Sequence, residues 1–398
     1  MTQVSTIWLV YQLTHSAIML GVVGFTGQIA SFVFGPFGGV IVDRFNRHTL
    51  LITTQILAMI QSLMLATMAL SNHISIEAII ILSFCQGLIN AIDAPTRQTF
   101  VKDMIESPND LMSAISLNSS LVTGARLIGP SLAGIVIARF GAGYCFLIDG
   151  LSYIAVIIGL LLMRFKRTYQ PEILVDSNFF ERIKEGFIYV FQSTPIRSVL
   201  LLMIVFSLMI MPNATLMPIF AMKILHGDAH TLGFLLAGSG LGALFGGIFM
   251  VNRKSIFGLE RIIAFAPIIS SIGLIFFSFS NVLWLSIPLL AIVGFGSIVQ
   301  ISSSNTLIQT LVDNDKRGRV MSIFTMAFLG ISPFGALLSG TLANYIGASR
   351  TLMLNGIICV VYALLFTRKL TQLEGLINSI FLTKGLVMPI KRKYTQLL

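Results

Sequence analysis

Residues 134–150 read GIVIARFGAGYCFLIDG, and the chain repeats this stretch 206 positions later, at 340–356, as GTLANYIGASRTLMLNG. Asp149 in the first copy is matched by the near-isosteric Asn355 in the second. An offset close to half the length of the 398-residue chain predicts two copies of one structural unit. The identical pairs are Gly134/Gly340, Gly141/Gly347, Ala142/Ala348 and Gly150/Gly356, joined outside the stretch by Ser116/Ser322, Gly124/Gly330, Gly129/Gly335 and Leu132/Leu338.

The composition places both copies in a lipid bilayer. Hydrophobic residues make up 55% of the chain and charged residues 11%, whereas soluble domains carry about 25% charged residues. The mean hydropathy is +0.89, and the 34 glycines suit close helix packing in lipid. These values predict an all-α membrane protein with many spanning helices. Parallel copies of this kind form a crevice at their interface, where a transported molecule would pass.

Other classes of function lack their sequence signals. No GxxxxGK[ST] phosphate-binding loop is present, so we do not expect the chain itself to use ATP. The three cysteines form no CxxC pair, and the five histidines have no spacing typical of a metal site. We find no combination of nucleophile and base. We therefore expect no cofactor, no metal ion and no enzymatic activity.

Apolar segments that can cross a hydrocarbon layer of about 30 Å occur eleven times. A further apolar segment at 4–13 has about half of the required length, and we interpret it as the outer part of a first helix whose beginning is absent. The predicted spans are 17–42, 50–71, 76–98, 111–138, 143–163, 197–222, 231–251, 260–279, 282–309, 319–345 and 348–366.

Lysine and arginine separate sharply between the alternate loops that these spans define. One side carries 22 of them, and the other carries three, Arg139, Lys223 and Arg350. Because basic loops stay in the cytoplasm, we predict that the 22-residue side faces the cytoplasm of a bacterium, across its inner membrane, and that the C-terminus lies there too. Orientation and lipid contact thus account for the net charge of +10, and we expect no nucleic-acid partner.

We expect four parts along the chain. Residues 1–163 form an N-terminal bundle of a partial first helix and helices 2 to 6, and 197–366 form a C-terminal bundle of helices 7 to 12. Residues 164–196 link the bundles in the cytoplasm, and 178–191 within this linker has the helical spacing of a segment lying on the membrane surface. Residues 367–398 form a basic cytoplasmic tail.

The turn between the second and third helices reads GGVIVDRFNR from residue 38 onward. A carboxylate at a helix end can hold a neighbouring helix N-terminus or an arginine, and such a contact can close a gate in one conformation and break in another. Ordinary basic anchoring of the turn is the alternative. The turn resembles motif A of the major facilitator superfamily, although Asn46 stands where that motif usually has glycine. The matching residues are Gly39, Asp43, Arg44 and Arg47.

The fifth helix contains the sequence ARLIGPSLAG. Pro130 removes a backbone donor and bends the helix, while Gly129 and Gly134 allow close packing. This pattern is similar to motif C of exporters in the same superfamily, although alanine replaces two of its glycines. With AIDAPTRQTFVKDMI at 91–105, it resembles the subgroup that includes the enterobactin exporter and macrolide-efflux proteins. The resemblance covers about 4–366 and implies the major facilitator fold, two six-helix bundles related by pseudo-two-fold symmetry, and alternating access.

Polar residues inside the predicted spans must face protein or water, because lipid cannot satisfy them. Five of them on the fourth helix follow steps of three and four, which places them on one stripe and predicts a cavity wall. Asp93 and Arg97 can pair at this spacing, and a structural bridge is their alternative role. The resemblance implies that helices 1, 4, 7 and 10 line the transport path. The candidate residues are Ser83, Gln86, Asn90, Asp93 and Arg97 on helix 4, Ser302, Asn305 and Gln309 on helix 10, and Asn213 beside a predicted kink at Pro212 on helix 7.

Arg126 lies near the middle of the fifth predicted span. An arginine there costs about 2.5–3.5 kcal/mol on insertion scales and requires a partner or water. We hypothesise that Arg126 binds an anionic group of the substrate or responds to the protonation of Asp149 on the sixth helix. A structural contact between the two helices is the alternative.

Taken together, these patterns predict a monomeric secondary exporter of a small siderophore-like or drug-like molecule, driven by proton exchange. Its expected partners are that small molecule, protons and membrane lipid. One alternative is an uptake permease or uniporter of the same fold. Another is a membrane protein that does not transport because its first helix is truncated.

Overall fold

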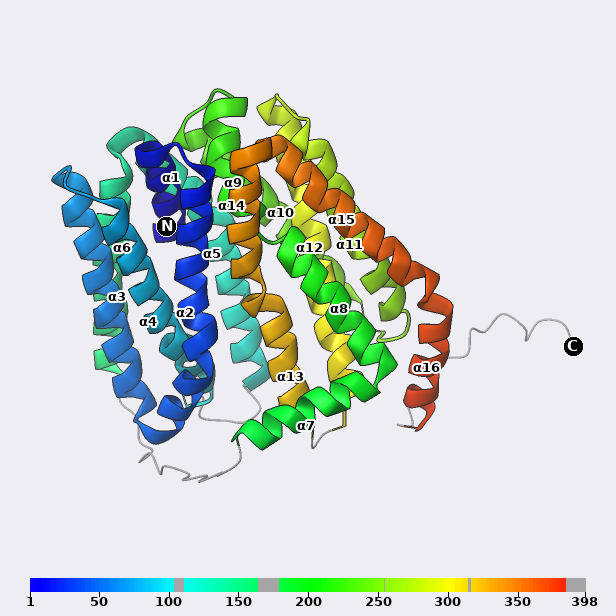
Figure 1. The fold of residues 1–398 in the computed structure, drawn as a ribbon. Helices are drawn as coiled ribbons and strands as arrows, with labels where there is room; N and C mark the ends of the chain where they lie inside the picture. The colour runs from blue at the N-terminus through cyan, green and yellow to red at the C-terminus, as the bar shows by residue number, and fades with distance from the viewer. Residues whose placement is uncertain (104–110, 164–178, 254, 314–315, 384–398) are drawn as a thin grey trace, which may run out of the picture.

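The computed structural model describes residues 1–103, 111–163, 179–253, 255–313 and 316–383, and these ranges fold into helices without a strand (Figure 1). The prediction of an all-α protein is thereby confirmed. The helices before the linker are α1 (Thr2–Thr14), α2 (Ala17–Arg44), α3 (Arg47–Leu70), α4 (Ile76–Asp103), α5 (Leu111–Phe140) and α6 (Ala142–Leu162). Those that follow are α7 (Phe179–Gln192), α8 (Thr194–Met209), α9 (Asn213–Ile219), η2 (Phe220–Ile224), α10 (Ala229–Asn252), α11 (Leu259–Ser278), α12 (Leu283–Leu311), α13 (Arg317–Thr325), η3 (Met326–Gly330), α14 (Ser332–Ile346), α15 (Ala348–Arg368) and α16 (Leu370–Thr383).

Ten helical segments within the described residues are long and apolar enough to cross a membrane. They coincide with ten of the eleven predicted spans, whose apolar residues favour helix because every backbone donor is then satisfied within the segment. The remaining span, α5, contributes a described apolar stretch at Ile128–Phe140. The half-length segment predicted at 4–13 forms α1.

Two of these spans are interrupted rather than straight. The predicted kink occurs where α8 ends at Met209 and α9 begins at Asn213, directly after the buried Pro212. A second interruption, which we did not predict, is the π-helical turn η3 between α13 and α14. Pro333 follows it at the start of α14, and its missing N–H leaves a carbonyl one turn earlier without its usual α-helical donor.

The helices pack in the same pairs before and after the linker. In the first half (α1–α6), α2 packs on α4 and α3 packs on α6, and in the second half (α8–α15), α10 packs on α12 and α11 packs on α15. This repetition of partners is the spatial counterpart of the sequence repeat. The bundle boundaries predicted at 163 and 197 stay a prediction, because 164–178 lies outside the described residues.

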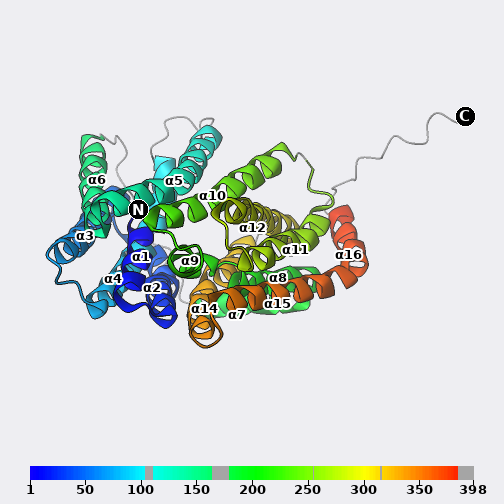
Figure 2. The ribbon, with the colours of Figure 1, turned by 90° about the horizontal axis from the view of Figure 1, so that it is seen from above.

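The two halves lie side by side, as the view from above shows (Figure 2). The turns α2–α3, α10–α11 and α12–α13 lie at the same end as α7, and we call this the basic end because the clustered lysines and arginines occur there (Figure 1). The principal contacts between the halves join α2 to α14 and α5 to α10. Toward the basic end, α2 and α13 diverge (Figure 1).

Two amphipathic helices lie at the basic end, α7 across it and α16 at the outer edge of the second half (Figures 1 and 2). The segment predicted at 178–191 forms α7, which contacts α8 and α13. The predicted tail begins with α16, which packs against α11 through a salt bridge of 2.7 Å between Arg261 and Glu374 and an edge contact of Phe257 with Phe381. Residues 384–398 of the tail lie outside the described part of the chain.

Candidate functional site

Glycines form the two seams that join the halves. In the α5–α10 seam, a Cβ at Gly134 would lie 2.9 Å from the Cα of Gly233. In the α2–α14 seam, a Cβ at Gly340 would lie 2.8 Å from the Cα of Gly21. Separations under 3.0 Å leave no room for a side chain, so the backbones themselves are in contact. Gly134 and Gly340 are equivalent positions of the repeat, and the two seams are therefore two copies of one contact.

Both seams lie near the end opposite the basic end. Gly134 is six residues before the end of α5, and Gly21 is four residues after the start of α2. Within the predicted helix-5 motif, the carbonyl oxygen of Pro130 also approaches Gly233, at 3.2 Å from a Cβ built there. Gly129, by contrast, has open space where a Cβ would stand. The close packing expected of this motif therefore depends on Gly134.

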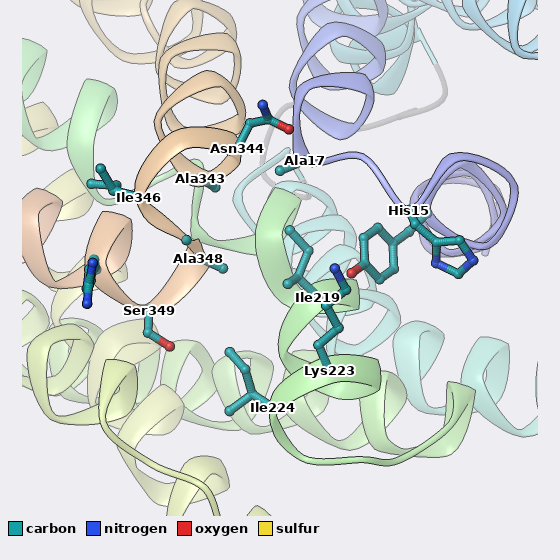
Figure 3. Close-up of a pocket in the computed structure, with 13 residues that line it drawn as sticks. His15, Ala17, Ile219, Lys223, Ile224, Ala343, Asn344, Ile346, Ala348 and Ser349 are labelled. Atoms are coloured by element: carbon teal, nitrogen blue, oxygen red, sulfur yellow. The ribbon is translucent and has the colours of Figure 1, made fainter.

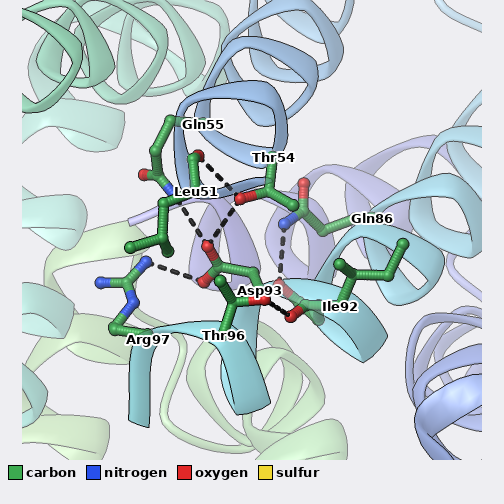
Figure 4. A network of polar contacts seen from close by, with 9 residues as sticks. Leu51, Thr54, Gln55, Gln86, Ile92, Asp93, Thr96 and Arg97 are labelled. Carbon is green, nitrogen blue, oxygen red and sulfur yellow. Dashed lines mark hydrogen bonds and ion pairs between the residues drawn. The ribbon is translucent and has the colours of Figure 1, made fainter. Parts of the chain in front are cut away.

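A buried carboxylate network connects α3 and α4 (Figure 4). Asp93 is only 9% exposed, and its carboxylate accepts hydrogen bonds from the Gln55 amide at 2.7 Å and the Thr54 hydroxyl at 2.9 Å. Arg97 donates to the other carboxylate oxygen at 2.8 Å, which is the pairing that their i, i+4 spacing indicates. Three donors from two neighbouring helices therefore surround this carboxylate. Asp93 thus contacts α3, and the cavity wall that we expect it to share with Asn90 stays a prediction.

Sequence reasoning missed Thr54 and Gln55. Both residues are buried and uncharged, and they are adjacent on α3, so no charge and no helical spacing singles them out. A usable signal was available, since a glutamine in the middle of an apolar span needs a polar partner. That partner is Asp93 on the neighbouring helix.

Four of the other predicted wall residues pair within their own helices. Gln86 donates to Asn90 at 3.1 Å on α4, and Gln309 donates to Asn305 at 2.8 Å on α12. Ser83 and Ser302 are half-buried on the same two helices, α4 and α12. A further polar pair on α12, which we did not predict, is fully buried, with Gln300 donating to Ser304 at 3.3 Å.

Asn213 caps the kink that precedes it. Its side-chain amide donates to the carbonyl of Ile210, in the interruption between α8 and α9, at 2.8 Å. The backbone N–H of Asn213 donates to the same Ile210 carbonyl at 3.2 Å, so Asn213 holds the kink by two hydrogen bonds. The carbonyl that we expected the kink to expose stays a prediction.

Asp149 on α6 lies where α1 approaches. Its carboxylate accepts a hydrogen bond of 2.5 Å from the hydroxyl of Thr2, and the Ser62 hydroxyl lies 3.5 Å away. The side chain of Arg126, the partner that we considered for Asp149, lies outside the described residues, so the hypothesis that links the two stays a prediction.

At the turn that resembles motif A, Asn46 has a structural role. Its side chain accepts from the backbone N–H groups of His48 at 2.9 Å and Thr49 at 3.2 Å and so caps α3. Arg44 is exposed at the end of α2, and Arg47 begins α3. Gly39 and the side chain of Asp43 lie outside the described residues, so the expected gate contact stays a prediction.

Contacts that sequence reasoning missed hold α7 to the second half. The Glu185 carboxylate pairs with Arg319 at the start of α13, and the Tyr189 hydroxyl donates to Asp313 at 3.2 Å. Lys316 lies over the Tyr189 ring, 4.9 Å from its centre. Among the described residues, we find no group of three or more His, Cys, Asp or Glu side chains that could hold a metal ion.

Comparisons with known proteins point to one family. The sequence model of the transmembrane secretion effectors matches residues 1–383. The chain is 25% identical to the staphyloferrin A transporter of Staphylococcus aureus over 382 residues, covering 94% of this chain and 93% of the relative. It is 22% identical to macrolide efflux protein A of Streptococcus pyogenes over 381 residues, with the same coverage. A crystal structure of the peptide transporter POT superposes with a TM-score of 0.75 at 12% identity, covering 94% of this chain and 92% of that one.

Proposed function

Because the chain belongs to the transmembrane secretion effector family of the major facilitator superfamily, we propose that it exports a small organic molecule from a bacterial cell by alternating access. Its all-helical membrane fold is that of major facilitator transporters, and the family is one of transporters and not of enzymes. The proposed step is movement of a solute from the basic end, facing the cytoplasm, to the opposite end, in exchange for protons.

The observation that carries the proposal is the position of the two glycine seams. Both join the halves near the opposite end, while α2 and α13 diverge toward the basic end. This arrangement suits a transporter closed on one side and ready to receive its solute from the other. The seams consist of backbone and small side chains, so the halves can separate there without breaking charged contacts. Rocking about the interface would open the opposite end.

The direction is supported by the relatives. Macrolide efflux protein A of Streptococcus pyogenes is named for efflux, and the staphyloferrin A transporter of Staphylococcus aureus is named for a siderophore. Export of a siderophore-like or drug-like molecule by this chain fits both names. The helix-5 pattern around Pro130, similar to that of exporters, supports the same direction.

The polar residues of helices 4 and 10 are assigned to the solute path in this proposal. The amide pairs Gln86–Asn90 and Asn305–Gln309 can exchange their mutual hydrogen bonds for bonds to a solute. Asp93, Arg97 and Asp149 are proposed to carry the proton coupling, because carboxylates held by neutral and cationic donors change those partners when they bind a proton. Arg126 is proposed to hold an anionic group of the solute. The acting unit is proposed to be a monomer.

The test is an export measurement in which the solute is identified by the experiment itself. Culture media of cells producing the chain and cells producing a Gly340→Trp variant, which cannot close the α2–α14 seam, are compared by untargeted mass spectrometry. We expect compounds enriched only by the unaltered chain, and we expect inside-out vesicles to accumulate them until a protonophore is added. Accumulation by right-side-out vesicles instead would overturn export, and indifference to the protonophore would overturn proton coupling.

A further inference from the structure

A cavity of about 380 Å³ lies at the end opposite the basic end and is shared by both halves (Figure 3). The first half contributes the end of α1 and the start of α2, and the second half contributes α9, η2 and the turn between α14 and α15. Ala17 belongs to this cavity and also to the α2–α14 seam, because its carbonyl oxygen would lie 2.6 Å from a Cβ at Gly340. The cavity is therefore adjacent to the seam that must open for release. We call it the exit pocket.

The exit pocket is lined by positive charge without an acid. Lys223 and Arg350 are two of the three basic residues on this side of the predicted topology, and both line it together with His15. None of the 13 lining residues is an aspartate or glutamate. Neither Lys223 nor Arg350 forms an ion pair with any described residue. Two cations in one concave site, without a carboxylate to neutralise them, create a field that attracts anions.

A second observation points to a ligand. Tyr11 lines the exit pocket and is 1% exposed, yet its hydroxyl has no hydrogen-bond partner among the described residues. Buried polar groups are almost always paired, and leaving one unpaired costs stability. The ring of His15 holds the Tyr11 ring by an edge contact, with centroids 5.7 Å apart. Among the described residues, the hydroxyl is thus an unpaired donor in the wall of a cationic cavity.

The backbone adds further donors. Ala348 and Ser349 line the exit pocket at the first turn of α15, a 21-residue helix whose N-cap, Gly347, makes no side-chain hydrogen bond. The N–H of Gly347 donates to Ala343 at 3.0 Å, but the first N–H groups of a helix have no partner within it and carry its positive dipole end. Ammonium, guanidinium, phenol and amide donors together match the oxygens of a carboxylate or a phosphate.

We propose that the exit pocket binds a carboxylate or phosphate group of the exported solute on its way out. This inference rests on the proposed function and names the chemical class of its substrate as anionic. An anion in the exit pocket contacts residues of both halves, so it would hold them together until the α2–α14 seam opens. The headgroup of an anionic lipid offers the same chemistry, and the test separates the two sources.

The test measures binding to the full chain in nanodiscs of phosphatidylcholine, with succinate as the probe and inorganic phosphate as a second one. We expect saturable binding that weakens about tenfold in Lys223→Gln and in Arg350→Gln, since each removes one charge-assisted contact. Tyr11→Phe should weaken it as well. The matched control is Arg139→Gln, a basic residue on the same side but outside the exit pocket, and it should bind as the unaltered chain does. Thermal unfolding shows whether each variant is folded.

Three results would overturn the proposal. They are no saturable binding of either probe, binding by Lys223→Gln and Arg350→Gln as tight as that of the unaltered chain, or a loss in Arg139→Gln as large as theirs. A lipid arm uses nanodiscs with phosphatidylglycerol. If phosphatidylglycerol stays bound to the unaltered chain alone and succinate cannot displace it, the occupant is a headgroup and the solute assignment fails. Binding needs no proton gradient, so export that fails while binding persists would contradict the proposed function and leave the exit pocket standing.

Discussion

Gly134 of α5 meets Gly233 of α10 backbone to backbone, with 2.9 Å between a Cβ built on Gly134 and the Cα of Gly233. Gly340 and Gly21 repeat this contact at 2.8 Å on the other side of the interface. The two contacts join equivalent helices of the two halves, so the interface has the same internal symmetry as the sequence repeat. The alternating access that we propose requires both seams to open in the second conformation.

A methyl group in either seam is predicted to impair transport. Gly134→Ala and Gly340→Ala each place a Cβ under 3.0 Å from the partner backbone, and such overpacking costs about 1–3 kcal/mol. That cost falls on the state closed at the opposite end, so its population should fall about tenfold relative to the open state. Gly129→Ala, on the same helix but in open space, is the matched control. Equal export by all three variants at equal membrane abundance would contradict the role of the seams.

The sequence predicted close packing at a glycine of this interface but not its position between the halves. Gly134 and Gly340 stand in the quoted stretch, and their recurrence indicated duplicated helices with close packing. Their partners Gly21 and Gly233 could not be predicted, because which helices face each other across the interface is set by the packing of whole bundles. The apolar spans were predictable for a simpler reason. Each must satisfy its own backbone in lipid, which makes helix type and length local properties.

The polar network shows the same division between local and distant contacts. The pairing of Asp93 with Arg97 follows from their i, i+4 spacing and was predictable. The donors Thr54 and Gln55 belong to another helix and depend on how α3 rotates against α4. The break at η3 was missed because the proline that accompanies it, Pro333, lies after the turn and not within it.

Neutralising the buried carboxylate is predicted to uncouple transport. Asp93→Asn keeps an oxygen for Gln55 and Thr54 but loses the ion pair with Arg97, so we expect proton-driven export to fall at least fivefold. The free energy of unfolding should fall by about 1–3 kcal/mol, as for one buried polar partner left unsatisfied. The control is Glu77→Gln, an acid at the other end of α4. Unchanged proton dependence in vesicles carrying Asp93→Asn would remove Asp93 from the coupling path.

Asp149 offers a second test of coupling. Asp149→Asn retains an acceptor for the Thr2 hydroxyl, so α6 should pack as before. If the charge of Asp149 is needed, export by Asp149→Asn should fall severalfold at unchanged membrane abundance. Export by Arg126→Gln should fall to the same extent. The double variant should then be no worse than either single one, because both act on one interaction. Normal export by both single variants would leave only a structural role for the pair.

The pair that holds α7 to α13 is predicted to tolerate exchange of its charges. Glu185→Arg or Arg319→Glu places like charges together, and the combined variant restores an opposite pair. Glu185 is more than half exposed, so the pair contributes no more than about 1 kcal/mol and each single variant should stay folded. Amide hydrogen exchange in α7 should be about fivefold faster in the single variants and recover in the double one. Equal rates of amide hydrogen exchange in α7 of all four proteins would show that α7 docks without this pair.

The direction of the chain across the membrane is predicted from its charges, and labelling of single exposed cysteines tests it. Ser255→Cys lies in the α10–α11 turn at the basic end, and His73→Cys lies in the α3–α4 turn at the opposite end. In intact cells, a membrane-impermeant maleimide should label the cysteine at 73 and spare the one at 255, because basic loops stay inside. In permeabilised cells, the reagent should label both cysteines. The unaltered chain sets the background, since Cys145 and Cys359 are buried and Cys85 lies within a span. Labelling of the cysteine at 255 alone in intact cells would show the opposite orientation. The exit pocket would then face the cytoplasm as an entry site.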